Sequence, residues 1–148
     1  MKSILVAVDF SELTEPCCQL AARLADQSGA ALHLLHVAAP NPDFVGFEAG
    51  PDVERHNRAE SLRDEHRQLE GLKQTLQDEG RDVYMHLVEG ATADTILEQA
   101  GKLQAQMIVL GSHGHGALHH TLMGSVSHDV LKDAVCPVLF YPAASLNA

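Results

Sequence analysis

The sequence predicts an α/β protein, with one domain built around a parallel sheet. Apolar runs that are typical of buried strands alternate with amphipathic helical segments along the chain. A length of 148 residues and a hydrophobic content of 45% are enough for one packed core and leave no room for two. The alternation indicates right-handed crossovers, with helices on both faces of the sheet. We therefore expect residues 1–148 to form one domain.

The N-terminal part of the chain supplies two strands and the first helix. Ser3 to Val8 is an apolar run, and Thr14 to Pro16 then predict a helix N-terminus with proline in the first turn. Ala31 to Val37 is a second strand, apolar except for two histidines, as expected of a strand covered on both faces. Between them, apolar residues recur at helical spacing until Gly29 ends the pattern: Leu13, Cys17, Leu20, Ala21, Leu24 and Ala25.

A loop and a long charged helix follow. Prolines and glycines interrupt the chain from Ala38 to Pro51, which predicts a loop. From Asp52 to Glu79 the pattern predicts a helix whose charged residues cover a solvated face. Its apolar residues form one stripe: Leu62, Leu69, Leu72 and Leu76.

The C-terminal half repeats the strand and helix pattern. Asp82 to Val88 is a third strand and Ala91 to Leu103 a helix, because apolar residues recur there at helical spacing. Met107 to Leu110 is a fourth strand. Ser125 to Ala134 and Pro137 to Tyr141 then form the last helix and the fifth strand.

The segment G-S-H-G-H-G-A-L-H-H-T-L-M-G-S joins the fourth strand to the last helix. Gly111, Gly114, Gly116 and Gly124 can adopt a positive φ and expose N–H groups without a Cβ in the way. Ser125 lies at or near the helix N-cap, where the first-turn amides meet the positive end of the helix dipole. The segment therefore predicts a phosphate site, with an empty tight turn as the alternative.

The spacing of these glycines differs from the two common phosphate signatures. The chain contains no G-x-x-x-x-G-K-[ST], and no G-x-G-x-x-G follows the first strand. Instead, two residues separate Gly111 from Gly114, and nine separate Gly114 from Gly124 and Ser125. This spacing resembles the G-2x-G-9x-G-(S/T) pattern of the ATP-binding branch of the universal stress protein family.

Three further landmarks are similar to that family, in the same order along nearly the whole chain. They are I-L-V-A-V-D-F-S from Ile4, L-H-L-L-H-V from Leu32 and C-P-V-L-F from Cys136. The resemblance implies a Rossmann-like domain with a five-stranded parallel sheet of order 3-2-1-4-5. It also implies an adenine nucleotide as ligand, ATP or else ADP or AMP, with or without Mg²⁺ or Mn²⁺.

With that strand order, the ends of the first and fourth strands border one crevice. The carboxylate of Asp9 can accept hydrogen bonds from a ribose hydroxyl or an adenine amino group, or it can instead cap the turn with Ser11. The resemblance further implies that the backbone of Val37 lies against adenine, with Ala7 beside the ring. The expected nucleotide-binding residues are Ala7, Val8, Asp9, Val37, Gly111, Ser112, Gly114, His115, Gly124, Ser125 and Val126.

The nine-residue span departs from the family, whose members usually carry basic residues there. This chain has His115 and His120, with His119 adjacent. Imidazole is half protonated at about pH 6.5, so triphosphate binding would be weaker, metal-dependent or pH-sensitive. A second interpretation makes these three and His113 a transition-metal site. We favour hydrogen bonds to phosphate or water, because the cluster contains no carboxylate or cysteine.

Composition excludes several classes of partner. A net charge of −10 disfavours nucleic acid, which is bound through clustered lysine and arginine. No apolar run reaches the roughly 18 to 20 residues of a membrane span, and the N-terminus does not resemble a signal peptide. Cys17 and Cys18 are adjacent in a helix and Cys136 is single, so we expect buried thiols in the cytoplasm.

The predicted function is that of a nucleotide-binding regulatory protein or stress-response switch. The chain shows no nucleophile elbow, no paired carboxylates and no lysine placed for phosphoryl transfer, so ATP hydrolysis would be slow at most. The alternatives are a nucleotide-free scaffold of the same fold and an enzyme acting on adenylated substrates. The run from Val135 to Tyr141 would leave an apolar sheet edge, and the resemblance implies a homodimer through it. An unidentified regulatory protein would be the other partner.

Overall fold

The computed structural model describes residues 2–40, 52–112 and 124–147. Within these residues the sheet has five parallel strands in the order β3-β2-β1-β4-β5, which confirms the expected topology. The strands are β1 (Ser3–Ala7), β2 (Ala31–Ala38), β3 (Val83–Glu89), β4 (Met107–Ser112) and β5 (Val138–Pro142). The helices are α1 (Thr14–Ser28), α2 (Asp52–Asp78), α3 (Thr92–Lys102), α4 (Ser125–Asp133) and the short 3-10 helix η1 (Ala143–Asn147), which was not predicted.

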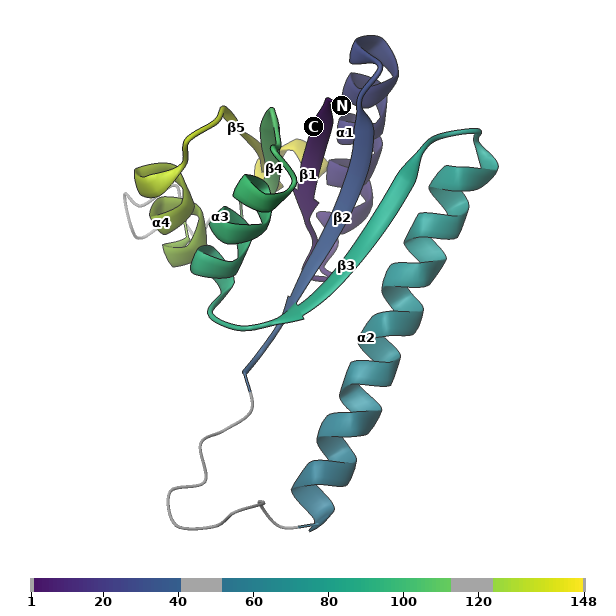
Figure 1. Cartoon of the computed structure of the whole chain (residues 1–148), viewed down its shortest axis with the longest axis vertical. Coiled ribbons are helices and arrows are strands. Elements are labelled where there is room, and N and C mark those ends of the chain that lie inside the picture. The colour runs from purple at the N-terminus through teal and green to yellow at the C-terminus, as the bar shows by residue number, and fades with distance from the viewer. Residues whose placement is uncertain (1, 41–51, 113–123, 148) are drawn as a thin grey trace.

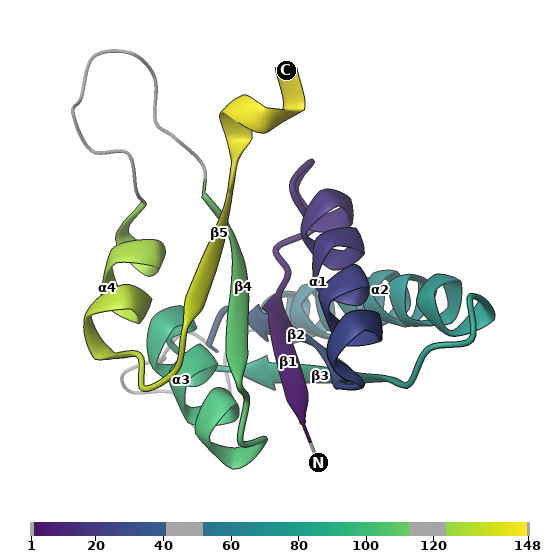
Figure 2. The ribbon, with the colours of Figure 1, turned by 90° about the horizontal axis from the view of Figure 1, so that it is seen from above.

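Helices cover both faces of the sheet, as predicted. Helices α1 and α2 lie on one side and α3 and α4 on the other (Figures 1 and 2). Side chains of a strand alternate between the faces, so Val6 joins the cluster under α1 and α2, whereas Leu5 joins the cluster under α3 and α4. The core therefore consists of two apolar layers separated by the sheet.

Most predicted boundaries are shifted by a residue, and three of the differences bear on the end of the sheet where the site lies. Strand β1 ends at Ala7 rather than Val8, and β4 runs on through Gly111 and Ser112. The longer β4 is explained by its partner, since Gly111 and Ser112 still pair with β5. At the start of α1, Thr14 is already the first helical residue, and Leu13 occupies the cap position without a side-chain hydrogen bond.

Two of the three thiols are buried in the layer beneath α1. Burial raises the pKa of Cys17 to about 11, helped by the nearby Asp9 carboxylate, and raises that of Cys18 to about 12. Cys136 is only partly buried, so the expectation of a buried thiol is wrong at this position. Cys17 and Cys18 remain protonated and unreactive at neutral pH.

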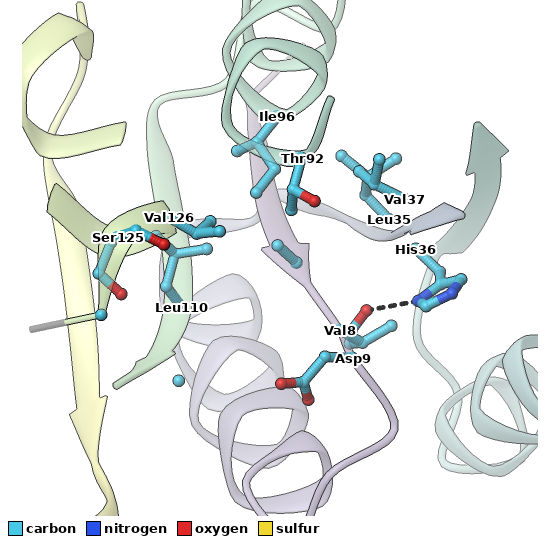
Figure 3. A pocket seen from close by; sticks show the side chains of 14 residues that line it. Val8, Asp9, Leu35, His36, Val37, Thr92, Ile96, Leu110, Ser125 and Val126 are labelled. Carbon is cyan, nitrogen blue, oxygen red and sulfur yellow. Dashed lines mark hydrogen bonds between the residues drawn. The ribbon is translucent and has the colours of Figure 1, made fainter. Parts of the chain in front are cut away.

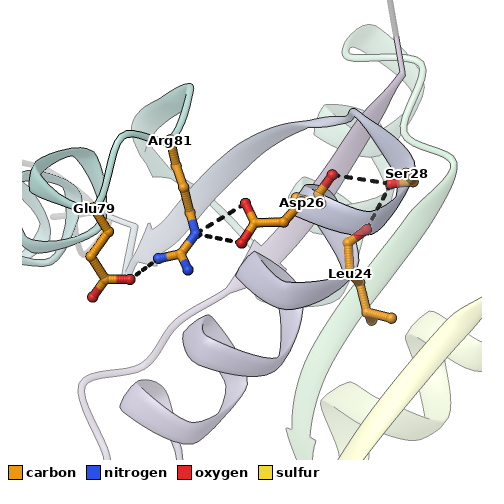
Figure 4. Close-up of polar contacts among 6 residues, drawn as sticks. Leu24, Asp26, Ser28, Glu79 and Arg81 are labelled. Atoms are coloured by element: carbon orange, nitrogen blue, oxygen red, sulfur yellow. Dashed lines mark hydrogen bonds and ion pairs between the residues drawn. The ribbon is translucent and has the colours of Figure 1, made fainter.

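An arginine joins the two helices of one face at the amino end of the sheet (Figure 4). The Nε of Arg81 donates to both carboxylate oxygens of Asp26, at 3.1 and 3.0 Å, and its Nη1 pairs with Glu79. Asp26 belongs to α1, and Glu79 directly follows α2. The contact ties these two helix ends together at the edge of the sheet opposite the strands' carboxyl ends.

In the part of the chain that the structure covers, no helix combines the length and the apolar character needed to cross a membrane. Helix α2 has 27 residues but is rich in charged side chains.

Two histidines bridge the neighbouring strands β2 and β3. The Nδ1 of His33 and the Nε2 of His86 lie 3.0 Å apart, and the ring of Tyr84 stacks on His33 with centroids 5.0 Å apart. Only one proton fits between the two facing nitrogens, so one ring donates and the other accepts. Burial lowers the pKa of both imidazoles; for His33 the proximity of His86 lowers it further, and Asp82 partly offsets this.

We predict that the free energy of unfolding falls as the pH drops below about 6.5. Both folded-state pKa values lie below the ordinary 6.5, so the unfolded chain binds protons first as the pH falls. Urea midpoints measured between pH 8 and pH 5 should decrease toward acid, and the His33→Leu/His86→Leu double variant should show a shallower decrease. His66→Ala, at an exposed position of α2, is the control. Equal pH dependence in the double variant and the wild type would contradict the prediction.

Candidate functional site

A cavity of about 440 Å³ lies at the carboxyl ends of the central strands (Figure 3). Residues of β1, β2 and β4 form its base, and the first turns of α3 and α4 form two of its walls. This volume falls within the range of about 300–1,000 Å³ found for small-molecule sites.

The cavity exists because β1 is shorter than its two neighbours. Ala7, the last residue of β1, pairs with Leu35, while β2 continues to Ala38. On the other side, the last pair between β1 and β4 is Val6 with Val109, while β4 continues to Ser112. The sheet is thus notched between β2 and β4. The notch lies where the winding direction reverses, the usual ligand position in such sheets.

The structure brings together eight of the eleven residues predicted for the site. Ser112 is not among them, because its side chain is buried beside Gly111 instead of lining the cavity. Gly114 and His115 lie outside the described residues, as do Gly116 and the metal-site candidates His113, His119 and His120. The eight that line the cavity are Ala7, Val8, Asp9, Val37, Gly111, Gly124, Ser125 and Val126.

Asp9 lines the cavity and also caps the turn before α1. Its Oδ1 accepts hydrogen bonds from the backbone N–H of Ser11 at 3.0 Å and from the Thr14 hydroxyl at 3.4 Å. The turn-capping role considered from the sequence is therefore present. The same bonds hold the carboxylate at the cavity, so one role does not exclude the other.

The structure describes two glycines of the motif, and a positive φ is not the reason for glycine at either position. Neither Gly111 nor Gly124 has one. Gly111 allows a close approach of Leu13, because a Cβ at Gly111 would lie 3.0 Å from both the Cβ and the Cδ1 of Leu13, and Leu13 would have to move to admit it. Among the described residues, no atom would lie within 4 Å of a Cβ at Gly124. The absence of a side chain thus lets α1 come close at one glycine, whereas no described atom is near the other.

Helix α4 begins with its amides at the cavity. Gly124, not Ser125, is the N-cap residue, with φ −68° and ψ 166°, and no side chain of the described residues caps the helix. The first helical bond runs from the N–H of His128 to the carbonyl of Gly124. The N–H groups of Ser125 and Val126 therefore have no partner within the helix, and both residues line the cavity. Such a helix start attracts anions.

The backbone of Val37 also faces the notch. In β2 the N–H of Ala31 donates to Lys2 on the β1 side, whereas the N–H of Leu32 donates to Asp82 on the β3 side. Main-chain groups alternate sides along a strand, so Val37, like Ala31, directs its N–H and C=O toward β1. Because β1 has ended there, these two groups face the cavity.

The sequence missed six residues of the lining. His36, Leu110 and Ser127 each adjoin a predicted residue in the sequence, and Leu35 lies two residues from Val37, so adjacency was the available signal. The other two, Thr92 and Ile96, come from α3, whose contribution depends on how that helix packs against the sheet.

The described lining carries few charges. Asp9 and His36 are its ionisable side chains, and it contains no lysine or arginine. An anion bound here, in a chain of net charge −10, would depend on the backbone amides of α4. In the described residues no three metal-binding side chains cluster together.

The family model for the universal stress protein family matches residues 1–142. The chain belongs to this family. It is 35% identical over 140 residues to a universal stress protein of Thermus aquaticus, with 93% of this chain and 96% of the relative covered. It is 32% identical over 139 residues to universal stress protein MJ0531 of Methanocaldococcus jannaschii, with 93% and 80% covered.

Solved structures of the family have the same fold. Protein MJ0577 of Methanocaldococcus jannaschii matches with a TM-score of 0.78 and 28% identity, over 95% of each chain. The universal stress protein of Archaeoglobus fulgidus in complex with dAMP matches with a TM-score of 0.65 and 24% identity, over 95% and 97%. A universal stress protein in complex with cAMP matches with a TM-score of 0.72 and 20% identity, over 95% and 96%.

We predict unequal losses of stability at the two glycines. Gly111→Ala should lower the free energy of unfolding by about 1–3 kcal/mol, because its Cβ overpacks against Leu13. Gly124→Ala should cost less than about 1 kcal/mol, since alanine is only a poorer N-cap. Urea unfolding of the ligand-free variants measures both. Equal losses would show that the close approach of α1 to Gly111 does not constrain the fold.

Proposed function

We propose that this universal stress protein belongs to the ATP-binding branch and binds an adenine nucleotide in the cavity at the end of β1. Occupancy would switch its contacts with a regulatory partner in a stress response, with at most slow ATP hydrolysis. One observation carries the proposal: a single cavity gathers apolar walls, a carboxylate and the amides of a helix N-terminus.

The apolar end of the cavity suits a purine base. Leu35, Ile96 and Leu110 contribute its hydrophobic walls (Figure 3). The N–H and C=O of Val37 lie beside them and can pair with the hydrogen-bonding edge of adenine. A base held in this way is bound by burial and by backbone groups together.

The opposite side of the cavity suits a ribose and its phosphates. The Asp9 carboxylate can accept a hydrogen bond from a ribose hydroxyl. The amides of Ser125 and Val126 would receive the phosphates, and Gly124 leaves space in front of them. The motif spacing adds Gly114 and His115 to the proposed contacts. Mg²⁺ or Mn²⁺ would neutralise the remaining phosphate charge of ATP. ADP and AMP carry less charge and would depend less on the metal ion.

The two relatives solved with dAMP and cAMP support the choice of ligand class. At 24% and 20% identity their likeness shows the fold alone, so the proposal depends on the cavity of this chain. Binding of an unrelated small molecule in the same cavity is the competing possibility, and a guanine nucleotide serves as the test of base selectivity.

We further propose a cytoplasmic homodimer that pairs through β5. In the described sheet β5 is an edge strand, and the apolar side chain of Val135, just before it, is 90% exposed. Leu131 in α4 is 50% exposed. An apolar edge of this kind favours pairing with a second copy.

Nucleotide binding is tested by thermal unfolding with ATP, ADP, AMP, cAMP and GTP, with and without Mg²⁺ or Mn²⁺. A ligand at 100 times its Kd stabilises the folded state by about 2.7 kcal/mol, so adenine nucleotides should raise the melting temperature and GTP should not. Gly124→Asp should abolish the shift, because its carboxylate would repel phosphate. Gly124→Asn, which has the same shape without the charge, should retain part of it.

Asp and Asn are both good N-cap residues, so neither variant should be less stable than the wild type without ligand. The proposal fails if no adenine nucleotide stabilises the wild type, or if Gly124→Asp responds as the wild type does.

The dimer is tested by light scattering over a range of protein concentrations. Val135→Lys should shift the protein toward monomer, because a charge would enter the interface, without lowering the melting temperature of the monomer. Lys132→Arg, an exposed position of α4, is the control. A wild type that remains monomeric at high concentration would refute the proposal.

A further inference from the structure

We infer that His36 is a positioning residue for the nucleotide cavity, and that it couples helix α2 to the cavity through Glu65. The inference rests on the proposed nucleotide function. His36 lies in β2, and its ring reaches across to the end of β1 (Figure 3).

The imidazole of His36 replaces a missing main-chain hydrogen bond. Its Nδ1 donates to the carbonyl of Val8 at 2.8 Å. The N–H of Val8 still donates to the carbonyl of Leu35 at 2.8 Å, as in a regular parallel ladder. The next bond of that ladder would run from the N–H of Val37 to the carbonyl of Val8. The imidazole takes this carbonyl instead.

This replacement allows the notch to form. Val8 is only 5% exposed, so its carbonyl needs a partner when β1 turns away from β2. His36 supplies that partner from a side chain, and the backbone of Val37 then faces the cavity. Asp9, the residue directly after Val8, begins the turn that carries the carboxylate.

Two neighbours hold the ring in this position. The ring of Phe10 packs on that of His36 with centroids 4.4 Å apart, and Phe10 has a left-handed backbone with φ 59°. From α2, the Oε2 of Glu65 lies 3.5 Å from Nε2 of the ring, while its Oε1 accepts a hydrogen bond from the hydroxyl of Ser61. The left-handed conformation is unfavourable for phenylalanine, so surrounding contacts must maintain it.

The Glu65 carboxylate connects a distant helix to the site. Its Oε2 is buried and has no hydrogen-bond partner within the described residues, which leaves His36 as the group it faces. Because Nδ1 donates to Val8, the ring can offer an Nε2–H to this oxygen only as the imidazolium, and in that form the ion pair resists movement of the ring away from Glu65. A displacement of α2 is thereby transmitted to Val8 and Asp9 at the cavity.

The test compares nucleotide affinity in matched variants by calorimetry. His36→Leu should weaken binding of the adenine nucleotide about tenfold, the equivalent of one hydrogen bond. His36→Asn keeps a side-chain N–H near the position of Nδ1 and should restore most of the affinity. Glu65→Ala should weaken binding several-fold, and adding it to His36→Leu should cause no further loss, because both act through one ring.

The exposed pair of His66 and Glu70 supplies the control on the same helix. Their Nδ1 and Oε2 lie 3.9 Å apart, and both side chains are about half exposed or more. His66→Leu and Glu70→Ala should leave the affinity unchanged. If these two variants weaken binding as much as the His36 and Glu65 variants do, the loss is a general effect of changing α2. The specific coupling of Glu65 to the cavity through His36 would then be refuted.

A second measurement needs no nucleotide. Amide hydrogen exchange of the ligand-free protein should accelerate in His36→Leu at Ser11, whose N–H donates to Asp9, and stay slow at Leu5 in the core of β1. Failure of the wild type to bind nucleotide would refute the proposed function. Hydrogen exchange at Ser11 would still test the role of His36, because it is measured without nucleotide. Wild-type exchange at Ser11 in His36→Leu, or wild-type affinity in that variant, would overturn the role of His36.

Discussion

The early end of β1 between two longer strands is the constraint on which the rest of the site depends. A central strand of a parallel sheet normally gives all its main-chain groups to its neighbours. Here β1 stops at Ala7 while β2 and β4 continue, so backbone groups at the ends of these strands face a cavity instead of a partner strand. The turn at Asp9 and the first turns of α3 and α4 then enclose that space.

Such a notch is stable only if its polar groups are satisfied and its walls are held by the core. The carbonyl of Val8 is satisfied by His36, and the Asp9 carboxylate by the turn before α1. The two apolar layers on either side of the sheet hold the walls, since Ile96 and Leu110 belong both to a core layer and to the cavity lining. The site therefore shares residues with the core.

The electrostatics of the site follow from the same geometry. The chain is strongly acidic, and the described lining offers Asp9 and His36 in place of lysine or arginine. Within the described lining, attraction for an anion would come from oriented amides, which carry partial charge without a charged side chain. No described atom lies close in front of Gly124 at these amides, whereas Gly111 serves the contact between β4 and α1. Two glycines of one motif thus have different physical roles.

The sequence by itself determined the alternation of strands and helices, and through family resemblance the strand order and most of the cavity residues. These follow from local periodicity and from the spacing of glycines in the sequence. The contacts of Gly114 and His115 with the nucleotide remain predictions. Only the tertiary structure decided that Gly111 stays in β4, that Thr92 and Ile96 reach the cavity, and that His36 meets Val8 and Glu65. Each depends on contacts between segments far apart in the chain, which no local pattern encodes.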